Sequence, residues 1–356
     1  MSLRGRRTLW PAALEDAFVK AATLMLGRTI GLLPRIEPYT GFGTPRRVRI
    51  MARVLSSPRG PGARPQPVKR GFRAFLALPA PEQRVLISVA DQAIEATSDR
   101  GGYIDIEVDL PPEAPLAPGW NHVTLTTVSP HPSMIRAGLL VIGNEVRLGV
   151  ISDIDDTAMV TAVPKALVAA WNMLWVRTAT RQAVRGMPEL YAAIASQHPE
   201  APFVYLSAGA WNTARTIRRF LVRHGFPAGP LLLTDFGPTN TRFFRSGREH
   251  KTSSLIRLFE TFPHIRWVLL GDDGQADPEI YSTAAREHSD HVAAIGIRTL
   301  TRRQRFIATV GAAKDRSATS TQPALDSRVK TNGLDVPIVF GPDGEALAAE
   351  LKGLIA

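Results

Sequence analysis

The pattern of hydrophobic and polar positions divides the chain into two main parts. Between residues 45 and 129, short runs of alternating apolar and polar residues are separated by turns rich in glycine and proline. The strand candidates are Val48–Leu55, Arg84–Val89, Gln92–Thr97, Tyr103–Leu110 and Asn121–Val128. Closely spaced short strands without helices between them predict a small β-sandwich domain. This part of the sequence contains no catalytic cluster, and it leaves the role of the domain undetermined.

From residue 146 to residue 311 the pattern changes to strands that alternate with helices. Apolar runs of strand length occupy Leu148–Ser152, Phe203–Leu206, Leu231–Thr234, Trp267–Leu270 and Val292–Ile297. Helices are predicted between them, notably at Asn212–His224, Lys251–Thr261 and Pro278–Glu287. This alternation predicts an α/β domain with a parallel, Rossmann-like sheet.

The amino-terminal segment, residues 1–44, is predicted to hold a helix and a connection. Apolar residues follow helical spacing from Ala12 to about Arg28, and Pro34 and Pro38 end the helix. The segment is basic at its start, but acidic residues interrupt any apolar run, so we expect an ordinary amphipathic helix rather than a signal peptide.

The carboxyl-terminal part is predicted to contain a linker and two further elements. Residues 312–332 are polar and rich in serine and threonine, which is typical of a flexible linker. Residues 333–356 predict a strand at Val336–Phe340 and a helix at Glu345–Leu354 that dock back on the body.

The amino-acid composition and the net charge limit the kinds of ligand, surface and cellular compartment that suit this protein. The 356 residues include no cysteine, which excludes a disulfide framework and thiolate zinc sites and fits a reducing compartment. The net charge of +11 favours phosphorylated substrates, acidic lipid surfaces or nucleic acid, although an arginine-rich composition without functional meaning would also produce it. No apolar run reaches the roughly 20 residues of a membrane-spanning helix. We expect a cytoplasmic protein, with peripheral contact to an anionic membrane as a weaker alternative.

One apolar segment, Leu167–Val176, invites a membrane interpretation. It contains Trp171 and Trp175 at helical spacing and is too short to span a bilayer. The alternatives are a helix that packs in the core and a cap over the site that meets a lipid tail.

The chemistry of the chain is predicted to lie at the ends of the α/β strands. The strand Leu148–Ser152 ends in Asp153, Asp155, Asp156 and Thr157. Like charges packed this closely repel each other, so a fold retains them only with a compensating cation or a chemical use. Carboxylate and carbonyl oxygens are the ligands that Mg²⁺ prefers, and the same cluster offers a nucleophile and a second carboxyl for acid–base work.

Polar residues also follow three other positions that an α/β sheet brings to the same edge. Ser207 follows the second strand, Lys251 opens a helix, and Asp272, Asp273 and Asp277 follow the strand Trp267–Leu270. Each has an ordinary alternative: Ser207 or Asp277 as a helix cap, and Lys251 as a solvated side chain. Their coincidence at successive strand ends favours a shared site.

These motifs, in this order, resemble those of the haloacid dehalogenase superfamily. More narrowly, they resemble the App1-type, Mg²⁺-dependent phosphatidate phosphatase family over about residues 150 to 300. The segments that carry the likeness are Ser152–Thr157, Tyr205–Ser207 with Trp211–Asn212, Leu231–Pro238, Glu249–Lys251, and Gly271–Asp272 leading to Asp277–Tyr281. The resemblance implies a haloacid-dehalogenase-like domain with phosphatase activity.

The resemblance also implies a role for each residue. Asp153 would attack phosphorus and form an aspartyl-phosphate, and Asp155 would act as general acid and base. Asp153, the backbone carbonyl of Asp155 and Asp272 would hold Mg²⁺, with Asp277 or Asp273 acting through water. The residues that bind the phosphoryl group would be Ser207 and Lys251, and Thr157 would brace the loop.

The predicted function is therefore a Mg²⁺-dependent phosphomonoesterase, with phosphatidate as the favoured substrate. The first alternative is a phosphatase for a soluble or nucleic-acid phosphomonoester. The second is a non-catalytic protein that binds lipid or polyanions, although a binding module has no need of an acid–base group beside a nucleophile. The sequence does not define the natural substrate or the oligomeric state.

Overall fold

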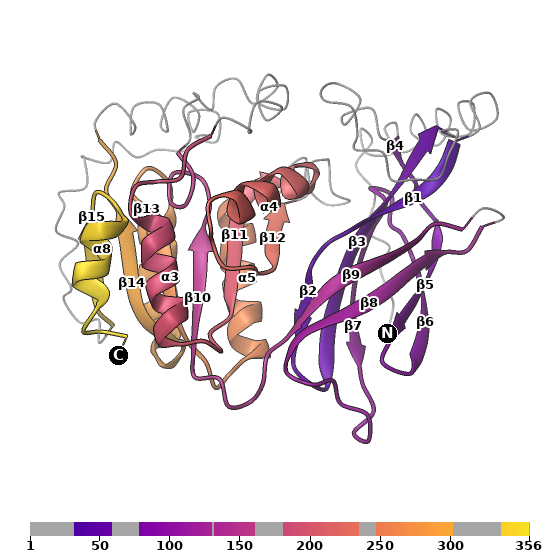
Figure 1. Ribbon diagram of the computed structural model, residues 1–356, viewed down its shortest axis with the longest axis horizontal. Coiled ribbons are helices and arrows are strands. Elements are labelled where there is room, and N and C mark those ends of the chain that lie inside the picture. Colours follow the sequence, from indigo (N-terminus) through magenta and orange to yellow (C-terminus); the bar gives the residue numbers. More distant parts are fainter. Residues whose placement is uncertain are drawn as a thin grey trace, which may run out of the picture. The chain divides into compact units, whose positions relative to one another are not determined.

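The computed structural model describes residues 32–58, 78–129, 132–160, 181–234, 247–301 and 336–355 (Figure 1). The chain separates into two compact units. Unit 1 comprises residues 1–144, 210–212 and 235–246, and unit 2 comprises residues 145–209, 213–234 and 247–356. The predicted amino-terminal helix, the predicted linker at residues 312–332 and the tryptophan segment Leu167–Val176 lie outside the described residues.

Unit 1 contains nine strands in one hydrogen-bonded sheet of mixed direction. They are β1 (Leu32–Pro38), β2 (Gly41–Gly43), β3 (Arg47–Pro58), β4 (Leu78–Pro79), β5 (Arg84–Val89), β6 (Gln92–Thr97), β7 (Tyr103–Asp109), β8 (Gly119–Thr127) and β9 (Met134–Val141). The order is β1-β3-β2-β9-β8-β5-β6, with β4 and β7 also paired to β3. The β2–β9 pair is parallel, whereas the other pairs with assigned registers are antiparallel.

Alternating apolar residues build the core of unit 1. In β5, for example, Val85, Ile87 and Val89 are buried and the residues between them are exposed, as expected for strands with one face toward a core. The buried side chains of β1, β3, β5, β7, β8 and β9 join one hydrophobic cluster. A single core thus holds together strands that are distant in the sequence.

The β region is larger than the range 45–129 that the sequence pattern indicated. β1 and β2 precede that range and β9 follows it. Pro34 and Pro38, which we expected to end a helix, lie in β1 instead. Proline is tolerated there because β1 is an edge strand whose partner among the described strands is β3, so one side of its backbone needs no ladder partner.

Unit 2 is built on a sheet of six parallel strands. They are β10 (Leu148–Asp153), β11 (Phe203–Ala210), β12 (Leu231–Thr234), β13 (Arg266–Asp272), β14 (Val292–Arg298) and β15 (Ile338–Gly341), in the order β12-β11-β10-β13-β14-β15. The described α-helices are α3 (Met187–Gln197), α4 (Ala214–Arg223), α5 (Gly247–Thr261), α6 (Asp277–Glu287) and α8 (Gly344–Leu351). The structure thus confirms an α/β fold with a parallel sheet, preceded by a β region.

The layers of unit 2 explain why its strands read as continuous apolar runs. Helix α3 packs with α8, and α5 packs with α6, and helices lie on both faces of the sheet (Figure 1). β10 and β14 are buried along almost their whole length because both of their faces are covered.

The strand order places a topological switch point beside β10. The chain moves from β10 to β11 and β12 on one side, and then returns to β13 on the other side of β10. The connections after β10 and β13 therefore leave the sheet in opposite directions. Ligand sites of open α/β sheets form at such a switch point, outside the carboxyl ends of the strands.

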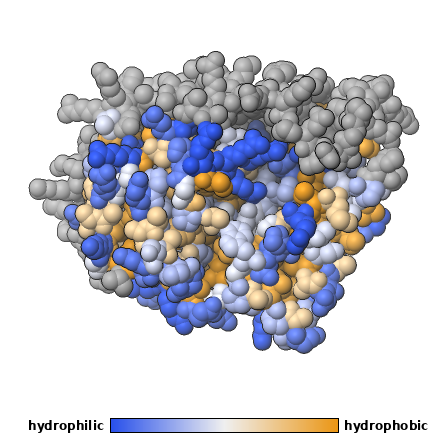
Figure 2. Space-filling model, viewed as in Figure 1, coloured by the Kyte–Doolittle hydropathy of each residue, from blue (hydrophilic) through white to orange (hydrophobic). Residues whose placement is uncertain are grey.

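The face seen in Figure 2 carries hydrophilic side chains interspersed with apolar ones. Among the helices that the structure describes, none is long and apolar enough to cross a membrane.

The pairing of β10 with β13 requires a glycine at position 149. Gly149 lies opposite Trp267, and a Cβ atom there would stand 2.5 Å from Cζ3 of the fully buried indole. Neither the strand backbone nor a buried ring can move away freely. We therefore expect Gly149→Ala to lower the free energy of unfolding by about 1–3 kcal/mol, as overpacking does in other cores. Denaturant unfolding of the full chain measures the change.

The control for this prediction is Gly353→Ala in the same unit. A Cβ atom at Gly353 would meet no atom within 4 Å, so its effect should stay within about 0.5 kcal/mol. Equal stabilities of the two variants would contradict the proposed steric constraint.

Candidate active site

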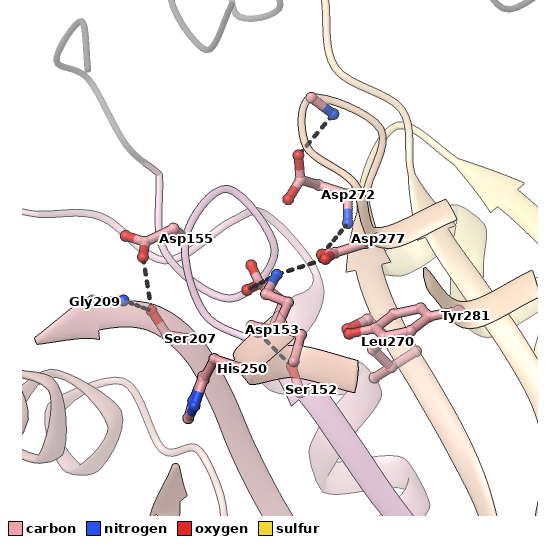
Figure 3. A network of polar contacts seen from close by, with 12 residues as sticks. Ser152, Asp153, Asp155, Ser207, Gly209, His250, Leu270, Asp272, Asp277 and Tyr281 are labelled. Atoms are coloured by element: carbon pink, nitrogen blue, oxygen red, sulfur yellow. Dashed lines mark hydrogen bonds and ion pairs between the residues drawn. The ribbon is translucent and has the colours of Figure 1, made fainter. Parts of the chain in front are cut away.

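Three buried carboxylates meet at the carboxyl end of the parallel sheet. Asp153 is the last residue of β10, Asp272 is the last residue of β13, and Asp277 is the first residue of α6. One carboxylate oxygen from each lies within 4.8 Å of the others, and the three residues are at most 1% exposed. Figure 3 shows Asp153 and Asp272 at the ends of their strands, with Asp277 beside them. The structure thus brings together residues that are more than a hundred positions apart.

A buried lysine from α5 binds two of these carboxylates. Lys251 donates from Nζ to Asp153 Oδ1 at 2.7 Å and to Asp277 Oδ1 at 2.5 Å. Its neighbour His250 turns the other way, with Nε2 3.2 Å from the carbonyl oxygen of Leu232 in β12. This contact ties α5 to the sheet. Lys251 is therefore part of the cluster rather than a solvated lysine, and it lies one turn inside α5 rather than at its start.

The cluster has the charge and the open ligand atoms that suit a divalent cation. Three ionised carboxylates and one ammonium leave a net charge of −2 among the four side chains. Asp153 Oδ2 and Asp272 Oδ2 are both buried and have no hydrogen-bond partner in the described part of the chain. Burying charged atoms without partners costs free energy. A divalent cation that prefers oxygen ligands could bind both of these carboxylate oxygens and remove that cost.

The protonation states reflect the same burial. Burial raises the pKa of Asp153 to about 8, against the opposing effect of Lys251, and the neighbouring carboxylates add to the rise. Burial, followed by the charges of Asp277 and Asp153, also raises the pKa of Asp272 well above its usual value. Burial lowers the pKa of Lys251, but its two carboxylate partners outweigh this effect, so its net pKa is raised. The lysine therefore remains a cation.

A second pair of polar residues lies beside the cluster. The hydroxyl of Ser207 in β11 donates to Asp155 Oδ2 at 3.0 Å, and the backbone N–H of Gly209 donates to the same hydroxyl at 2.9 Å. Asp155 is partly exposed, whereas Asp153 is fully buried. Ser207 does not cap the following helix, because the N-cap of α4 is Thr213. Figure 3 shows this pair next to Asp153.

The loop after β10 is fixed by a residue that the sequence analysis did not identify. Arg298, at the end of β14, donates from Nη1 to the backbone carbonyl of Asp156 at 2.5 Å. Asp156 has a positive φ of 62°, which is uncommon outside glycine. The hydroxyl of Thr157 is buried in this loop. The only sequence signal for Arg298 was a single arginine that follows the apolar run Val292–Ile297.

The sequence analysis left Asp273 and Asp277 as alternative cation ligands. In the structure their side chains have different partners. Asp273 Oδ1 accepts from the backbone N–H of Leu300 at 2.8 Å, so that carboxylate holds the end of β14. Asp277 instead points into the cluster. The other oxygen of Asp272, Oδ1, accepts from Gly274 N at 2.7 Å. The geometry therefore favours Asp277 over Asp273 as the additional cation ligand.

Helix α6 approaches the strand closely enough to require Gly271. A Cβ atom at Gly271 would lie 2.7 Å from the ring of Tyr281 and 2.8 Å from the side chain of Asp277. Tyr281 also donates its hydroxyl to the carbonyl oxygen of Leu270 at 3.3 Å. On β10, the hydroxyl of Ser152 contacts that of Tyr191. These buried contacts fix the strand ends from which the carboxylates project.

Fold and site together define an α/β domain with a candidate metal-dependent active site at the switch point of its sheet. Residues 148–299 match the family of catalytic domains described as phosphatidate phosphatase APP1, catalytic domain. The matched residues include every side chain of the site.

Two curated fungal proteins share this segment. Phosphatidate phosphatase APP1 of Saccharomyces cerevisiae is 26% identical over 152 residues, which are 42% of this chain and 26% of the yeast protein. An uncharacterized protein of Schizosaccharomyces pombe is 24% identical over 152 residues, which are 42% of this chain and 25% of its own length. The match thus spans about a quarter of the length of these relatives.

A solved structure with some likeness is a carbohydrate acetylesterase from Xanthomonas citri. It is 10% identical, with a TM-score of 0.28, and the match covers 78% of this chain and 73% of the esterase. A likeness this low carries no argument about function.

We predict that Mg²⁺ stabilises the folded protein through this cluster. A ligand that binds only the native state adds about 2.7 kcal/mol at a concentration 100 times its Kd. Thermal unfolding with MgCl₂ should therefore occur at a higher temperature than with NaCl of equal ionic strength. Asp272→Asn should remove most of the difference, because it replaces a charged ligand with a neutral amide. Asp290→Asn is the matched control and should retain the difference, because Asp290 is an exposed acid that precedes β14, whereas the cluster lies at the carboxyl ends of the strands.

The effect of Mg²⁺ should grow as the pH rises from about 6 to above 8. Because the pKa of Asp153 is raised to about 8, its carboxyl holds a proton below that pH, and the cation must displace it. Without the cation, stability falls as the pH rises toward the same value, and cation binding offsets this loss. A Mg²⁺ effect that is independent of pH, or unchanged in Asp272→Asn, would rule out this cluster as the cation site.

Proposed function

We propose that the chain is a Mg²⁺-dependent phosphomonoesterase of the haloacid dehalogenase type, which hydrolyses phosphatidate to diacylglycerol and phosphate. The observation that carries the proposal is the arrangement around Asp153. A buried carboxylate bound by a lysine lies next to a second, partly exposed carboxylate, Asp155, that is bound by a serine hydroxyl. A nucleophile beside an acid–base group is what hydrolysis through a covalent intermediate requires.

In the first half of the reaction, a carboxylate oxygen of Asp153 attacks phosphorus in line with the leaving group. The new bond joins this oxygen to phosphorus, and the bond from phosphorus to the ester oxygen breaks. Asp155 donates a proton to the departing alkoxide, which leaves as an alcohol. The aspartyl-phosphate remains on Asp153.

In the second half, water hydrolyses the aspartyl-phosphate. Asp155, now ionised, accepts a proton from water as the water oxygen attacks phosphorus. The bond between phosphorus and Asp153 breaks, and inorganic phosphate is released. Both carboxyl groups then return to their starting states, so one residue serves as acid and then as base.

Charge stabilisation around the transferred group comes from the neighbouring side chains. Lys251 and Ser207 flank Asp153 and Asp155, where they would neutralise and bind the phosphoryl oxygens. Asp153, Asp272 and Asp277 would hold Mg²⁺, together with the backbone carbonyl of Asp155. When bound there, Mg²⁺ supplies positive charge that offsets the carboxylates and the phosphoryl oxygens.

The phosphatidate assignment rests on the family of the segment and on the name of the yeast relative. The net charge of +11 is compatible with substrates at an anionic membrane surface. We therefore propose a cytoplasmic enzyme that contacts such membranes peripherally. If the substrate test shows hydrolysis of a soluble or nucleic-acid phosphomonoester instead, that ester replaces phosphatidate as the assigned substrate.

Substrate comparison with Mg²⁺ tests the proposal. We expect the full chain to release phosphate from phosphatidate in mixed detergent micelles faster than from soluble phosphomonoesters of similar concentration. Asp153→Asn should lower every such activity by on the order of 10³-fold or more, because an amide is a poor nucleophile. Phosphate release is measured directly, and the folded state of the variant is checked by its circular dichroism spectrum.

Two results would contradict parts of this proposal separately. Substantial activity in a folded Asp153→Asn protein would exclude the mechanism. Activity restricted to soluble esters would exclude phosphatidate and leave the mechanism in place.

A leaving-group comparison tests the role of Asp155. We expect Asp155→Asn to slow cleavage of alkyl phosphates by about 10²–10⁴-fold. Aryl phosphates should be affected less in the first step, because an aryloxide needs little protonation. Single-turnover measurements isolate that step from hydrolysis of the aspartyl-phosphate. Equal losses for both leaving groups would instead indicate that Asp155 has a structural or cation-binding role.

A further inference from the structure

Helix α4 is amphipathic in an unusual way. Its inward face carries Ala214, Ile217, Phe220 and Leu221, which are all buried. The opposite face carries Arg215, Arg218, Arg219 and Arg223, with Val222 between them. At 100° per residue these five positions fall within about 140° of the helix circumference. α4 therefore presents a continuous cationic face, here called the arginine face.

The arginine face opposes the local stability of its own helix. Arg215–Arg219 and Arg219–Arg223 are like-charged pairs at a spacing of four residues, which destabilise a helix. Arg215 also lies in the first turn, where the helix dipole disfavours a cation, and α4 contains no acidic residue. A sequence that departs from local rules in this way points to a function for the departure.

An exposed apolar side chain lies in the middle of the arginine face. Val222 is 70% exposed, although its neighbours in the sequence of α4 include well-buried apolar residues. Clustered arginines on the polar face of an amphipathic helix attract anionic lipid headgroups, and Val222 adds an exposed aliphatic side chain to this cluster.

The arginine face lies at the active-site end of unit 2. α4 follows β11, whose carboxyl end carries Ser207. In Figure 1 it lies across the ends of β11 and β12 toward which the strand arrows point. Figure 2, from the same side, shows strongly hydrophilic side chains gathered over this helix. A membrane bound to α4 would therefore lie near the end of the sheet that carries Asp153 and Asp155.

We propose that the arginine face is the docking surface for the anionic lipid bilayer that presents the substrate. The proposal rests on the proposed function, since it adds the surface through which a lipid phosphatase would reach its substrate. The guanidinium groups bind lipid phosphates, and Val222 inserts among the headgroups. α4 thus orients the carboxyl end of the sheet toward the bilayer without spanning it.

Vesicle co-sedimentation of the full chain tests the docking surface independently of catalysis. The probe is phosphatidylcholine vesicles that contain phosphatidylglycerol, an anionic phosphodiester that a phosphomonoesterase does not hydrolyse. We expect binding at low salt that weakens as salt increases. Because each arginine near an anionic surface contributes about fivefold, Arg215→Gln/Arg219→Gln should weaken binding roughly 30-fold. Val222→Ser should also weaken binding but leave its salt dependence unchanged.

Two matched variants control for charge and for side-chain identity. Arg257→Gln/Arg286→Gln removes the same charge from exposed positions on α5 and α6, and should reduce binding much less. Arg215→Lys/Arg219→Lys keeps the charge of α4 and should retain most of the binding. Activity on a soluble aryl phosphate should be unchanged in all these variants.

The possible results separate the docking surface from the proposed function. Equal losses in the α4 double variant and in the α5/α6 double variant would overturn the proposal, as would absence of vesicle binding at low salt. Strong binding of a nucleic-acid oligomer without vesicle binding would overturn it in favour of another polyanion. Vesicle binding that depends on α4, in a protein that hydrolyses no phosphomonoester, would support the surface and exclude the enzymatic function.

Discussion

The buried contact between Lys251 and two carboxylates is the interaction on which the site depends. Three aspartates held this far from water would repel each other and would largely take up protons. The ammonium of Lys251, 2.7 Å from Asp153, offsets part of that repulsion and fixes one oxygen of the carboxylate. When all three carboxylates are ionised, the four side chains carry a net charge of −2, and two carboxylate oxygens have no hydrogen-bond partner among the described residues. A divalent cation would neutralise this charge and bind both oxygens.

The fold supplies this contact through its strand order. Asp153 and Asp272 end adjacent parallel strands, so their side chains are neighbours wherever the sheet forms. Lys251 reaches them because α5 belongs to the connection that crosses from β12 back to β13. Asp277 begins the helix after β13. The cluster is therefore a consequence of topology, and Gly271 permits the last approach, because any side chain there would displace Asp277.

Much of this arrangement could be predicted from the sequence. The α/β class followed from the apolar runs, since strands buried on both faces lack polar interruptions. The residues of the site followed from their positions after those runs. Sequence pattern also gave nearly correct bounds for β12 and α6. These features depend on local periodicity and on the rule that parallel strands end on one edge.

Other features depend on tertiary contacts and could not be predicted. The prolines of β1 suggested the end of a helix. That they lie in an edge strand is revealed only by the pairing of β1 in the folded chain. The role of Arg298 could not be read from the lone arginine after the apolar run, because its partner is a backbone carbonyl 142 positions away. The choice between Asp273 and Asp277 required the position of the Leu300 amide, which binds Asp273. Each depends on a contact between residues whose relative positions follow only from the folded chain.

The difference in exposure between the two catalytic candidates gives the site a direction. Asp153 is buried and bound by Lys251, whereas Asp155 beside it is partly exposed, so in the proposed reaction the phosphoryl group would approach from the side of Asp155. The leaving group would then point outward past Asp155, toward solvent or toward a surface bound there. A bulky alcohol such as diacylglycerol would not need to enter the core for its phosphate to reach the nucleophile. This geometry would suit a small reacting group carried on a large leaving group. In the proposed reaction, the surroundings of Asp155, rather than the buried cluster, would then select the substrate.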